Sequence, residues 1–322
     1  MNGRLGRREF LGRTAAIGAG IAVLGRTPAR AAEGGAKSVV VKAVRDDAVA
    51  DMKPNAPVVR EMVHAVVMKL SGKKTPEEAW KQYVKPSDVV ALKINCLFGV
   101  GAATHPEVTA AVVEGCQMAG VPADKIIVWD REDKDLEKSG YTISKGPGVR
   151  TLGVNGDWED QPTAIATCQG KLAKILTQKC TALINVPILK THVIAGVTMA
   201  LKNHYGSFHN ANQAHANGCD PFIAELNALD CIRKKTRLVV ADALLPVAEK
   251  GPQARPEWTW EYKTILASLD PVAIDYVGVK ILDEQRAKIN LPPIEPKCKC
   301  VQTAAAKGLG VADMSKIEVV KV

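Results

Sequence analysis

Short apolar runs rich in β-branched residues alternate with longer amphipathic stretches along this chain, and this alternation constrains the fold most strongly. Residues 87–96 (SDVVALKINC) and 124–130 (DKIIVWD) are predicted to be strands. Between them, residues 105–120 (HPEVTAAVVEGCQMAG) have the apolar spacing of a helix, with Pro106 near its first turn. A strand, a helix and a strand at this spacing form a βαβ unit, whose strands pair in parallel through a right-handed crossover.

The same alternation continues through the rest of the chain, which predicts an α/β fold. Because the strands are continuous apolar runs, we expect a mostly parallel sheet covered by helices on both faces. Glycine and turn residues dominate the middle of the chain, and they predict a glycine-rich excursion at about 131–170. Further strands are predicted at 37–44, 180–189, 236–244, 263–270 and 315–322, and further helices at 55–72, 196–206, 220–235, 271–289 and 300–310.

The N-terminal residues have the order of a twin-arginine export signal. The pair Arg7 and Arg8 precedes a weakly apolar run at 14–25 and an A-x-A arrangement that ends at Ala31. We therefore expect a signal peptide at 1–31 that is read by the twin-arginine export machinery, a single domain at 32–322, and a periplasmic protein. The apolar run has about a dozen residues, against the roughly 20 that a membrane span needs, so no permanent membrane span is expected. An amphipathic N-terminal helix and an uncleaved anchor are the alternatives.

The charge of the chain argues against a nucleic-acid partner. The full sequence has 43 Lys and Arg and 34 Asp and Glu residues, a net charge of +9. Residues 1–31 hold six arginines and one glutamate, which is +5, so residues 32–322 carry +9 − 5 = +4. A chain with this modest charge, no basic tail and few aromatic residues is not expected to bind nucleic acid.

Polar residues follow several predicted strands, at the points where a parallel sheet gathers its carboxyl ends. Ligands of open α/β sheets bind beyond this edge, so we expect these side chains to meet in one pocket. The segment 188–209 adds two lysines, three histidines and an asparagine among apolar residues. The predicted ligand-binding residues are Lys93, Asn95, Asn185, Lys202, Asn203, Asp242 and Asp270, and the predicted catalytic residues are Lys190, His192 and His204.

Each of these residue types suits a small anionic ligand. Lysines balance the charge of a carboxylate or phosphate, and a buried lysine loses its proton more readily. Asparagines orient a ligand by hydrogen bonds, and His192 or His204 would transfer protons or bind a metal. The alternatives are that the lysines cap the sheet and reach water, and that the histidines have structural roles. Asp270 also has a local explanation as the N-cap of the helix that starts at Pro271.

Two of the eight cysteines, Cys298 and Cys300, are flanked by lysines. Neighbouring positive charge lowers the pKa of a thiol and favours metal ligation or redox exchange. We therefore consider these two residues as ligands of an iron–sulfur cluster or a single metal, with a disulfide to a distant cysteine as the alternative. The sequence has no C-x-x-C-x-x-C run, so a ferredoxin-type domain is not expected.

The segment 184–206 (INVPILKTHVIAGVTMALKNHYG), together with the motifs ALKIN, HPEV, ASLDPVAID and AAAKGLG, resembles the domain of unknown function 362 family. The resemblance covers about 38–322 and implies an α/β domain of uncertain activity. Some relatives carry a twin-arginine leader, and some carry an iron–sulfur ferredoxin segment that this chain lacks. The residues that match the polar pattern of the family are Lys93, Asn95, Asn185, Lys190, His192, Lys202, Asn203, Asp242, Asp270 and Asp275.

These features together predict an exported enzyme with redox, metal- or cofactor-dependent chemistry, acting on a small anionic ligand through a Lys/His/Asn pocket. The alternative is a non-catalytic periplasmic protein that carries a cofactor or metal to a partner or assists its maturation. Both functions require the polar side chains of the separate segments to meet in space.

Overall fold

The structure is a computed structural model that describes residues 37–322, so the predicted export signal lies outside the described residues. Its centre is a ten-stranded sheet, accompanied by two small two-stranded sheets. The fourteen strands of the described residues are β1 (Ser38–Val44), β2 (Val49–Ala50), β3 (Lys53–Pro54), β4 (Val90–Ile94), β5 (Ile126–Asp130), β6 (Arg150–Gly153), β7 (Thr163–Ile165), β8 (Cys168–Gly170), β9 (Ala182–Val186), β10 (Ile188–His192), β11 (Gly196–Thr198), β12 (Thr236–Val247), β13 (Thr264–Ser268) and β14 (Ile317–Lys321).

The central sheet is mostly parallel, as the sequence predicted. Its main path has the order β14-β1-β13-β12-β9-β4-β5-β6, and β10 and β11 extend it beside β12. Strands β12, β9, β4, β5 and β6 are all parallel neighbours. Strand β13 is the exception on this path, because it runs antiparallel to both β1 and β12.

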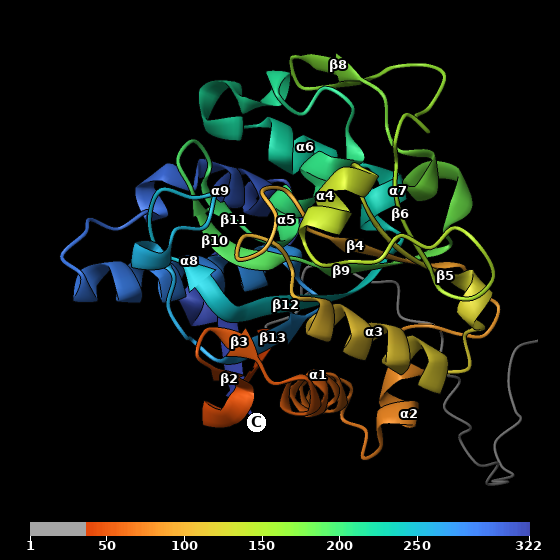
Figure 1. The fold of residues 1–322 in the computed structure, drawn as a ribbon. Helices are drawn as coiled ribbons and strands as arrows, with labels where there is room; N and C mark the ends of the chain where they lie inside the picture. The colour runs from red at the N-terminus through yellow and green to blue at the C-terminus, as the bar shows by residue number, and fades with distance from the viewer. Residues whose placement is uncertain (1–36) are drawn as a thin grey trace, which may run out of the picture.

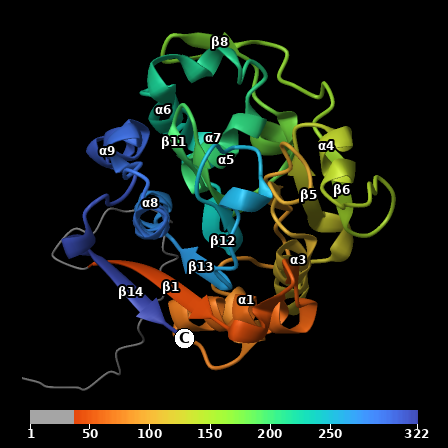
Figure 2. The same ribbon diagram turned by 60° about the vertical axis from the view of Figure 1, so that its left-hand side comes forward.

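Helices cover both faces of the sheet, which confirms the predicted layers (Figures 1 and 2). Successive residues such as Ala91 and Leu92 pack into two different core clusters, as the alternation of side chains along a strand requires. Helices α1, α2 and α3 contribute to one cluster, and α5, α6, α8 and α9 to the other. The helices of the described residues are α1 (Ala56–Ser71), α2 (Pro76–Trp80), α3 (Pro106–Met118), α4 (Asp133–Lys138), α5 (Ala200–Asn203), α6 (Phe222–Ala228), α7 (Asp230–Arg233), α8 (Pro271–Lys288) and α9 (Lys299–Ala306).

Three predicted elements differ in the structure. The strand predicted at 180–189 is two strands, β9 and β10, separated by Pro187, which cannot donate a hydrogen bond to a strand ladder. The helix predicted at 196–206 begins as strand β11, because its first residues pair with β10 in a hairpin, and only the short α5 follows. The helix predicted at 220–235 breaks at Leu229, whose backbone is extended.

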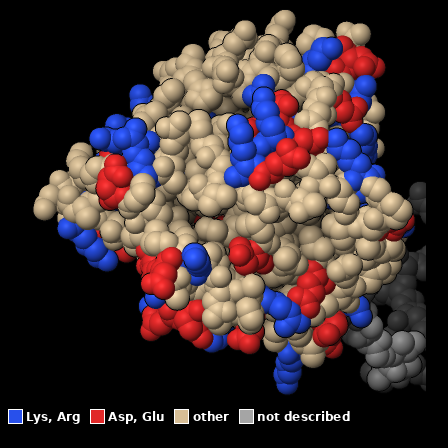
Figure 3. Space-filling model, viewed as in Figure 1, with Lys and Arg blue, Asp and Glu red and all other residues tan. Residues whose placement is uncertain are grey.

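The glycine-rich middle of the chain forms the excursion that the sequence predicted. It contains α4, the edge strand β6 and the small hairpin of β7 and β8, which lies away from the central sheet in Figure 1. In Figure 3, basic and acidic side chains lie in mixed groups on the visible face. Among residues 37–322, no helix combines the length and apolar character that crossing a bilayer requires.

Asp270 does not line the main pocket, so its predicted place among the ligand-binding side chains there is not supported. Because β13 is antiparallel to β12, its carboxyl end lies beside the start of β12. The carboxylate of Asp270 caps α8, accepting hydrogen bonds from the amides of Val272 and Ala273 at 2.9 and 2.8 Å. It also accepts hydrogen bonds from Ser38 Oγ and the amide of Val311.

Replacing this cap should destabilise the protein without changing ligand binding. Asp270→Ala leaves several donors without an acceptor, and we expect the free energy of unfolding to fall by about 1–2 kcal/mol. The control Asp270→Asn keeps a side-chain oxygen that can cap the helix and should lose less. Denaturant unfolding measures both variants. If Asp270→Ala instead kept its stability and lost anion binding, the residue would belong to the ligand site.

Candidate anion-binding pocket

A pocket of about 230 Å³ opens at the carboxyl ends of β4 and β5. Five of the ten residues predicted to bind ligand or act in catalysis line it, and they come from three separate segments of the chain. Half of the predicted residues therefore lie together at this edge of the sheet, and the other half do not line the pocket. The five residues are Asn95, Lys190, His192, Lys202 and Asn203.

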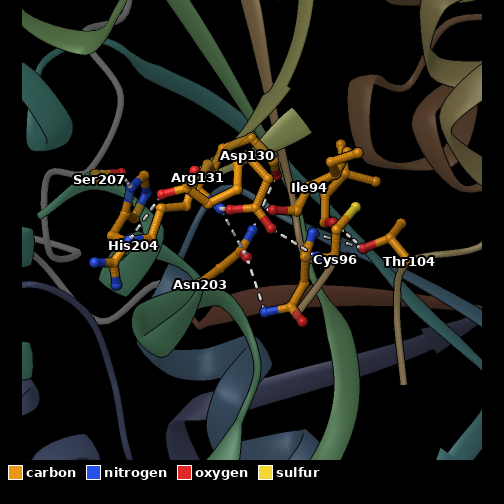
Figure 4. Close-up of polar contacts among 12 residues, drawn as sticks. Ile94, Cys96, Thr104, Asp130, Arg131, Asn203, His204 and Ser207 are labelled. Carbon is orange, nitrogen blue, oxygen red and sulfur yellow. Dashed lines mark hydrogen bonds and ion pairs between the residues drawn. The ribbon is translucent and has the colours of Figure 1, made fainter. Parts of the chain in front are cut away.

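Lys93 lies behind the pocket wall and forms a buried ion pair with Asp130. Its Nζ is 2.7 Å from Asp130 Oδ1 and also donates to the carbonyl of Ile94 at 2.6 Å. The other oxygen of Asp130 accepts a hydrogen bond from the amide of Cys96 at 2.6 Å. Figure 4 shows Asp130 between Cys96 and Asn203 in this network. The charge of Lys93 is thus balanced by a carboxylate, so it is not free to bind a ligand anion.

Gly206 allows this ion pair to approach the backbone of the neighbouring segment. A Cβ atom at this position would overlap the carboxylate of Asp130 and lie 2.8 Å from Lys93 Nζ. Any larger residue would therefore displace the pair. A glycine is needed here for close approach, with no requirement for unusual backbone angles.

Lys190 is completely buried and, among residues 37–322, has no carboxylate partner within hydrogen-bond distance. Its Nζ donates to Asn95 Oδ1 at 3.0 Å and to the carbonyl of Ala102 at 2.5 Å, both neutral acceptors. The pKa of Lys190 is lowered to about 7, chiefly by burial and also by the nearby charge of Lys202, against an opposing effect of Asp130. Near neutral pH this lysine is therefore ready to gain or lose a proton.

Lys202 is a second cation of the pocket that has no carboxylate partner among the described residues. Its Nζ lies 3.3 Å from His215 Nε2 and 3.5 Å from the centre of the Tyr205 ring. Burial lowers the pKa of Lys202 to about 8. A ring face and a neutral imidazole stabilise an ammonium only in part, so Lys202 retains the capacity to bind an anion.

His192 is held as a neutral hydrogen-bonding group. Its Nδ1 accepts hydrogen bonds from the amides of Ile194 and Ala195, at 3.2 and 3.1 Å, which leaves the ring proton on Nε2. The ring stacks on His215 with the centroids 5.4 Å apart. Burial, followed by the charge of Lys202, lowers the pKa of His192 to about 2. We therefore assign His192 as a hydrogen-bond donor, and the expected proton transfer finds no support in this geometry.

Asn203 connects the strands beneath the pocket. Its Nδ2 donates to the carbonyl of Lys93 at 2.9 Å and to Asn185 Oδ1 at 2.7 Å. Its Oδ1 lies 3.4 Å from Asn95 Nδ2. Asn203 and Asn95 thus meet at the pocket, whereas Asn185 supports them from below.

His204 and Asn185 line a separate small cavity of about 20 Å³ rather than the main pocket. His204 Nδ1 lies 3.2 Å from Ser207 Oγ, and burial lowers the pKa of His204 to about 3. The expected participation of His204 in proton transfer at the pocket is therefore not supported by its position.

Asp242 is also kept out of the main pocket, by His105. Asp242 Oδ2 accepts from the amide of His105 at 2.8 Å and lies 2.7 Å from its Nδ1. Burial by itself would lower the pKa of His105, but the carboxylate of Asp242 outweighs this effect and raises it. The pair fixes the start of α3 against β12.

Cys298 and Cys300 do not have the environment that their flanking lysines predicted. Both side chains are buried, and burial raises the pKa of Cys300 to about 12 and that of Cys298 as well. The expectation of lowered thiol pKa values is therefore wrong, because desolvation outweighs the nearby positive charge. Across residues 37–322, no three or more His, Cys, Asp or Glu side chains are grouped so that they could hold a metal.

Several residues that shape the pocket were not among the predicted site residues. Asp130 is a polar residue at the end of a predicted strand, which is the pattern that selected the other site residues, so the sequence could have identified it. The hydroxyl of Thr198 is buried without a hydrogen-bond partner among the described residues, and only the structure shows this. Other lining residues that were missed are Leu97, Phe98, Arg131, Asp135, Tyr205, Gly206, Ala211, Asn212, His215 and Pro252.

Comparison with known proteins identifies the family. The sequence profile of the family described as "Domain of unknown function (DUF362)" matches residues 90–280, which is more than half of the chain. The chain belongs to the DUF362 family. The matched DUF362 segment includes every lysine, histidine and asparagine of the pocket described above, whereas Cys298 and Cys300 lie beyond it.

Two further comparisons add little to the family assignment. A search of curated proteins found no match. Among solved structures, a crystal structure of a protein from Thermotoga maritima, a structural-genomics target, is similar at 10% sequence identity with a TM-score of 0.41. The alignment covers 79% of this chain and 59% of that chain. The present chain therefore spans about three fifths of the length of the Thermotoga protein.

The buried charge of Lys190 should make stability depend on pH. The pKa of Lys190 is about 7 in the folded state against its ordinary value of 10.5, so the unfolded state binds more protons between these values and stability rises with pH. Lys190→Met removes this dependence. We expect the wild type to gain up to about 1.4 kcal/mol per pH unit relative to Lys190→Met above pH 7.

Urea unfolding of the two proteins at pH 6, 7, 8 and 9 measures this difference. The control Lys69→Met removes a lysine that is exposed near the end of α1, and it should show no such gain. A constant difference between the wild type and Lys190→Met across the series would mean that Lys190 has no abnormal titration.

Proposed function

We propose that the pocket binds a small anion, with Lys190 and Lys202 supplying positive charge. The observation that carries this proposal is the complete burial of Lys190 with neutral hydrogen-bond acceptors alone. Burying an ammonium without a counterion is unfavourable, and a ligand carboxylate, phosphate or similar group would remove the penalty. Lys93 does not share this role because Asp130 already neutralises it.

Hydrogen-bond donors around the two lysines support the same proposal. Within the part of the chain that the structure describes, the Nε2–H of His192 makes no other hydrogen bond and the hydroxyl of Thr198 has no partner. Arg131 also lines the pocket. A charged oxygen group in the pocket would satisfy the Thr198 hydroxyl and accept from the imidazole.

We further propose that the protein is an enzyme in which Lys190 moves a proton. A general acid or base works best when its pKa is close to the working pH, and the pKa of Lys190 is about 7. His192 and His204 have pKa values of about 2 and 3, so neither is suited to this task at neutral pH.

A non-catalytic carrier is the second candidate. It is favoured by the low pKa values of both histidines, which leave the pocket with binding groups and few groups that exchange protons. Residues 1–31 keep their proposed role as a twin-arginine signal, and under either function the anion would then be met in the periplasm.

Anion affinity should fall as pH rises, because the lysines lose their charge. Sulfate is a suitable probe, since it remains a dianion from pH 6 to 9. From the pKa values of about 7 and 8, we expect sulfate affinity to fall by about tenfold per pH unit between pH 7 and 8 and by up to about a hundredfold per unit above pH 8, with proton uptake on binding. Isothermal titration calorimetry in buffers of different ionisation enthalpy measures both quantities.

Two variants test which side chains cause this behaviour. Lys190→Met and Lys202→Met should each weaken sulfate binding at pH 6.5 by about 10- to 100-fold, the value of a charge-assisted hydrogen bond. Lys69→Met serves again as the control and should bind as the wild type does. Sulfate affinity that is independent of pH and unchanged in both variants would overturn the proposal.

A further inference from the structure

The mouth of the pocket carries apolar side chains that the anion site itself does not need. They belong to residues 96–102, which follow β4 and which we name the rim loop. Leu97 and Phe98 both line the pocket, yet they are 50% and 47% exposed. Large apolar side chains left half-exposed at a cavity mark a place where a ligand or partner covers them.

The backbone of the rim loop holds Phe98 in this exposed position. Phe98 has a φ of +78°, a region that is unfavourable for a bulky residue. The conformation is fixed by hydrogen bonds from the amide of Val100 to the carbonyl of Lys138, at 3.2 Å, and from Ser139 Oγ to the carbonyl of Cys96, at 3.0 Å. Strain that is held in this way at a cavity is typical of functional sites.

The rim loop also contacts the proposed anion site directly. Its residue Ala102 provides the carbonyl that accepts a hydrogen bond from Lys190. The walls of the same cavity include the apolar surfaces of Tyr205, Ala211 and Pro252. The same cavity is therefore lined by the buried cations of Lys190 and Lys202 and by apolar surface, together with the carboxylates of Asp130 and Asp135.

We infer that the ligand is an amphiphilic anion: a carboxylate or phosphate that carries an aromatic or aliphatic group. The inference rests on the proposed anion site and adds the chemical class of the ligand. The charged group binds at Lys190 and Lys202, and the apolar group lies against Leu97 and Phe98. Such a ligand satisfies the buried ammonium and removes exposed apolar surface from water in one binding event.

Pairs of probes with the same charged group test this class. Phenylacetate is compared with acetate, and phenyl phosphate with methyl phosphate, by calorimetry at pH 6.5. Because each added apolar group that fits a pocket tightens binding by about tenfold or more, we expect the phenyl member of each pair to bind at least that much more tightly. Phe98→Gly and Leu97→Ser should reduce this preference to about threefold or less while leaving methyl phosphate binding unchanged.

The chain provides matched controls for these variants. Glycine adopts a φ of +78° readily, so Phe98→Gly should fold and melt at or above the wild-type temperature. Val100 lies in the same loop and is 77% exposed but does not line the pocket, so Val100→Ser should keep the full preference for phenyl probes. Equal losses in Val100→Ser and Phe98→Gly would overturn the inference.

The remaining outcomes separate this inference from the anion site on which it rests. If methyl phosphate binds but phenyl phosphate binds no better, the inference fails and the anion site stands. If neither probe binds, the proposed anion site itself is contradicted. Sedimentation with phosphatidylglycerol vesicles distinguishes a free ligand from a lipid headgroup. We expect the protein not to cosediment with the vesicles. Vesicle binding that competes with phenyl phosphate would mean that the ligand is a lipid headgroup, and it would overturn the inference of a free ligand.

Discussion

The burial of Lys190 without a counterion is the constraint on which the pocket depends. Lowering its pKa from 10.5 to about 7 corresponds to a penalty on the order of 5 kcal/mol for the charged form. Lys93, about as deeply buried, forms an ion pair with Asp130 instead. The fold therefore neutralises one buried lysine and leaves the adjacent one without a carboxylate partner. A protein core selected for stability alone would not retain that second charge.

Elements from distant parts of the sequence hold this arrangement in place. Pro187 separates β9 from β10, so that β10 can turn into the hairpin that carries Lys190 and Thr198 as a cross-strand pair. Asp275 of α8 accepts hydrogen bonds from the amides of Ala200 and Leu201, at 2.7 and 3.1 Å. These bonds fix the start of α5, whose next residues are Lys202 and Asn203. The positions of the polar groups are thus set by the sheet and by α8 together.

The sequence predicted the layers of the fold and the edge at which the pocket lies, because both follow from apolar periodicity and from the geometry of parallel sheets. It could not give the direction of β13, since a strand pattern is the same whichever way the chain runs. Asp270 was misplaced for this reason.

Protonation was the second property beyond the reach of the sequence. His192 looked like a base beside two lysines, but its Nδ1 is occupied by two backbone amides. Cys298 and Cys300 looked activated by neighbouring lysines, but burial raises their pKa values. In each case desolvation and hydrogen bonding decided the outcome, and both depend on packing between residues that are far apart in the chain.

The charges around the pocket respond to pH in the same sense. As pH falls from about 9 to 6, Lys202 and then Lys190 gain a proton, given their pKa values of about 8 and 7. Burial also raises the pKa of Asp275 to about 8, so this carboxylate loses its negative charge over the same interval. All three changes make the region around the pocket more positive. A bound anion would offset the cost of burying the charged form of Lys190, because it would supply the negative partner that the ammonium group lacks. Binding, proton uptake and the free energy of the folded state are therefore coupled through a single buried ammonium group.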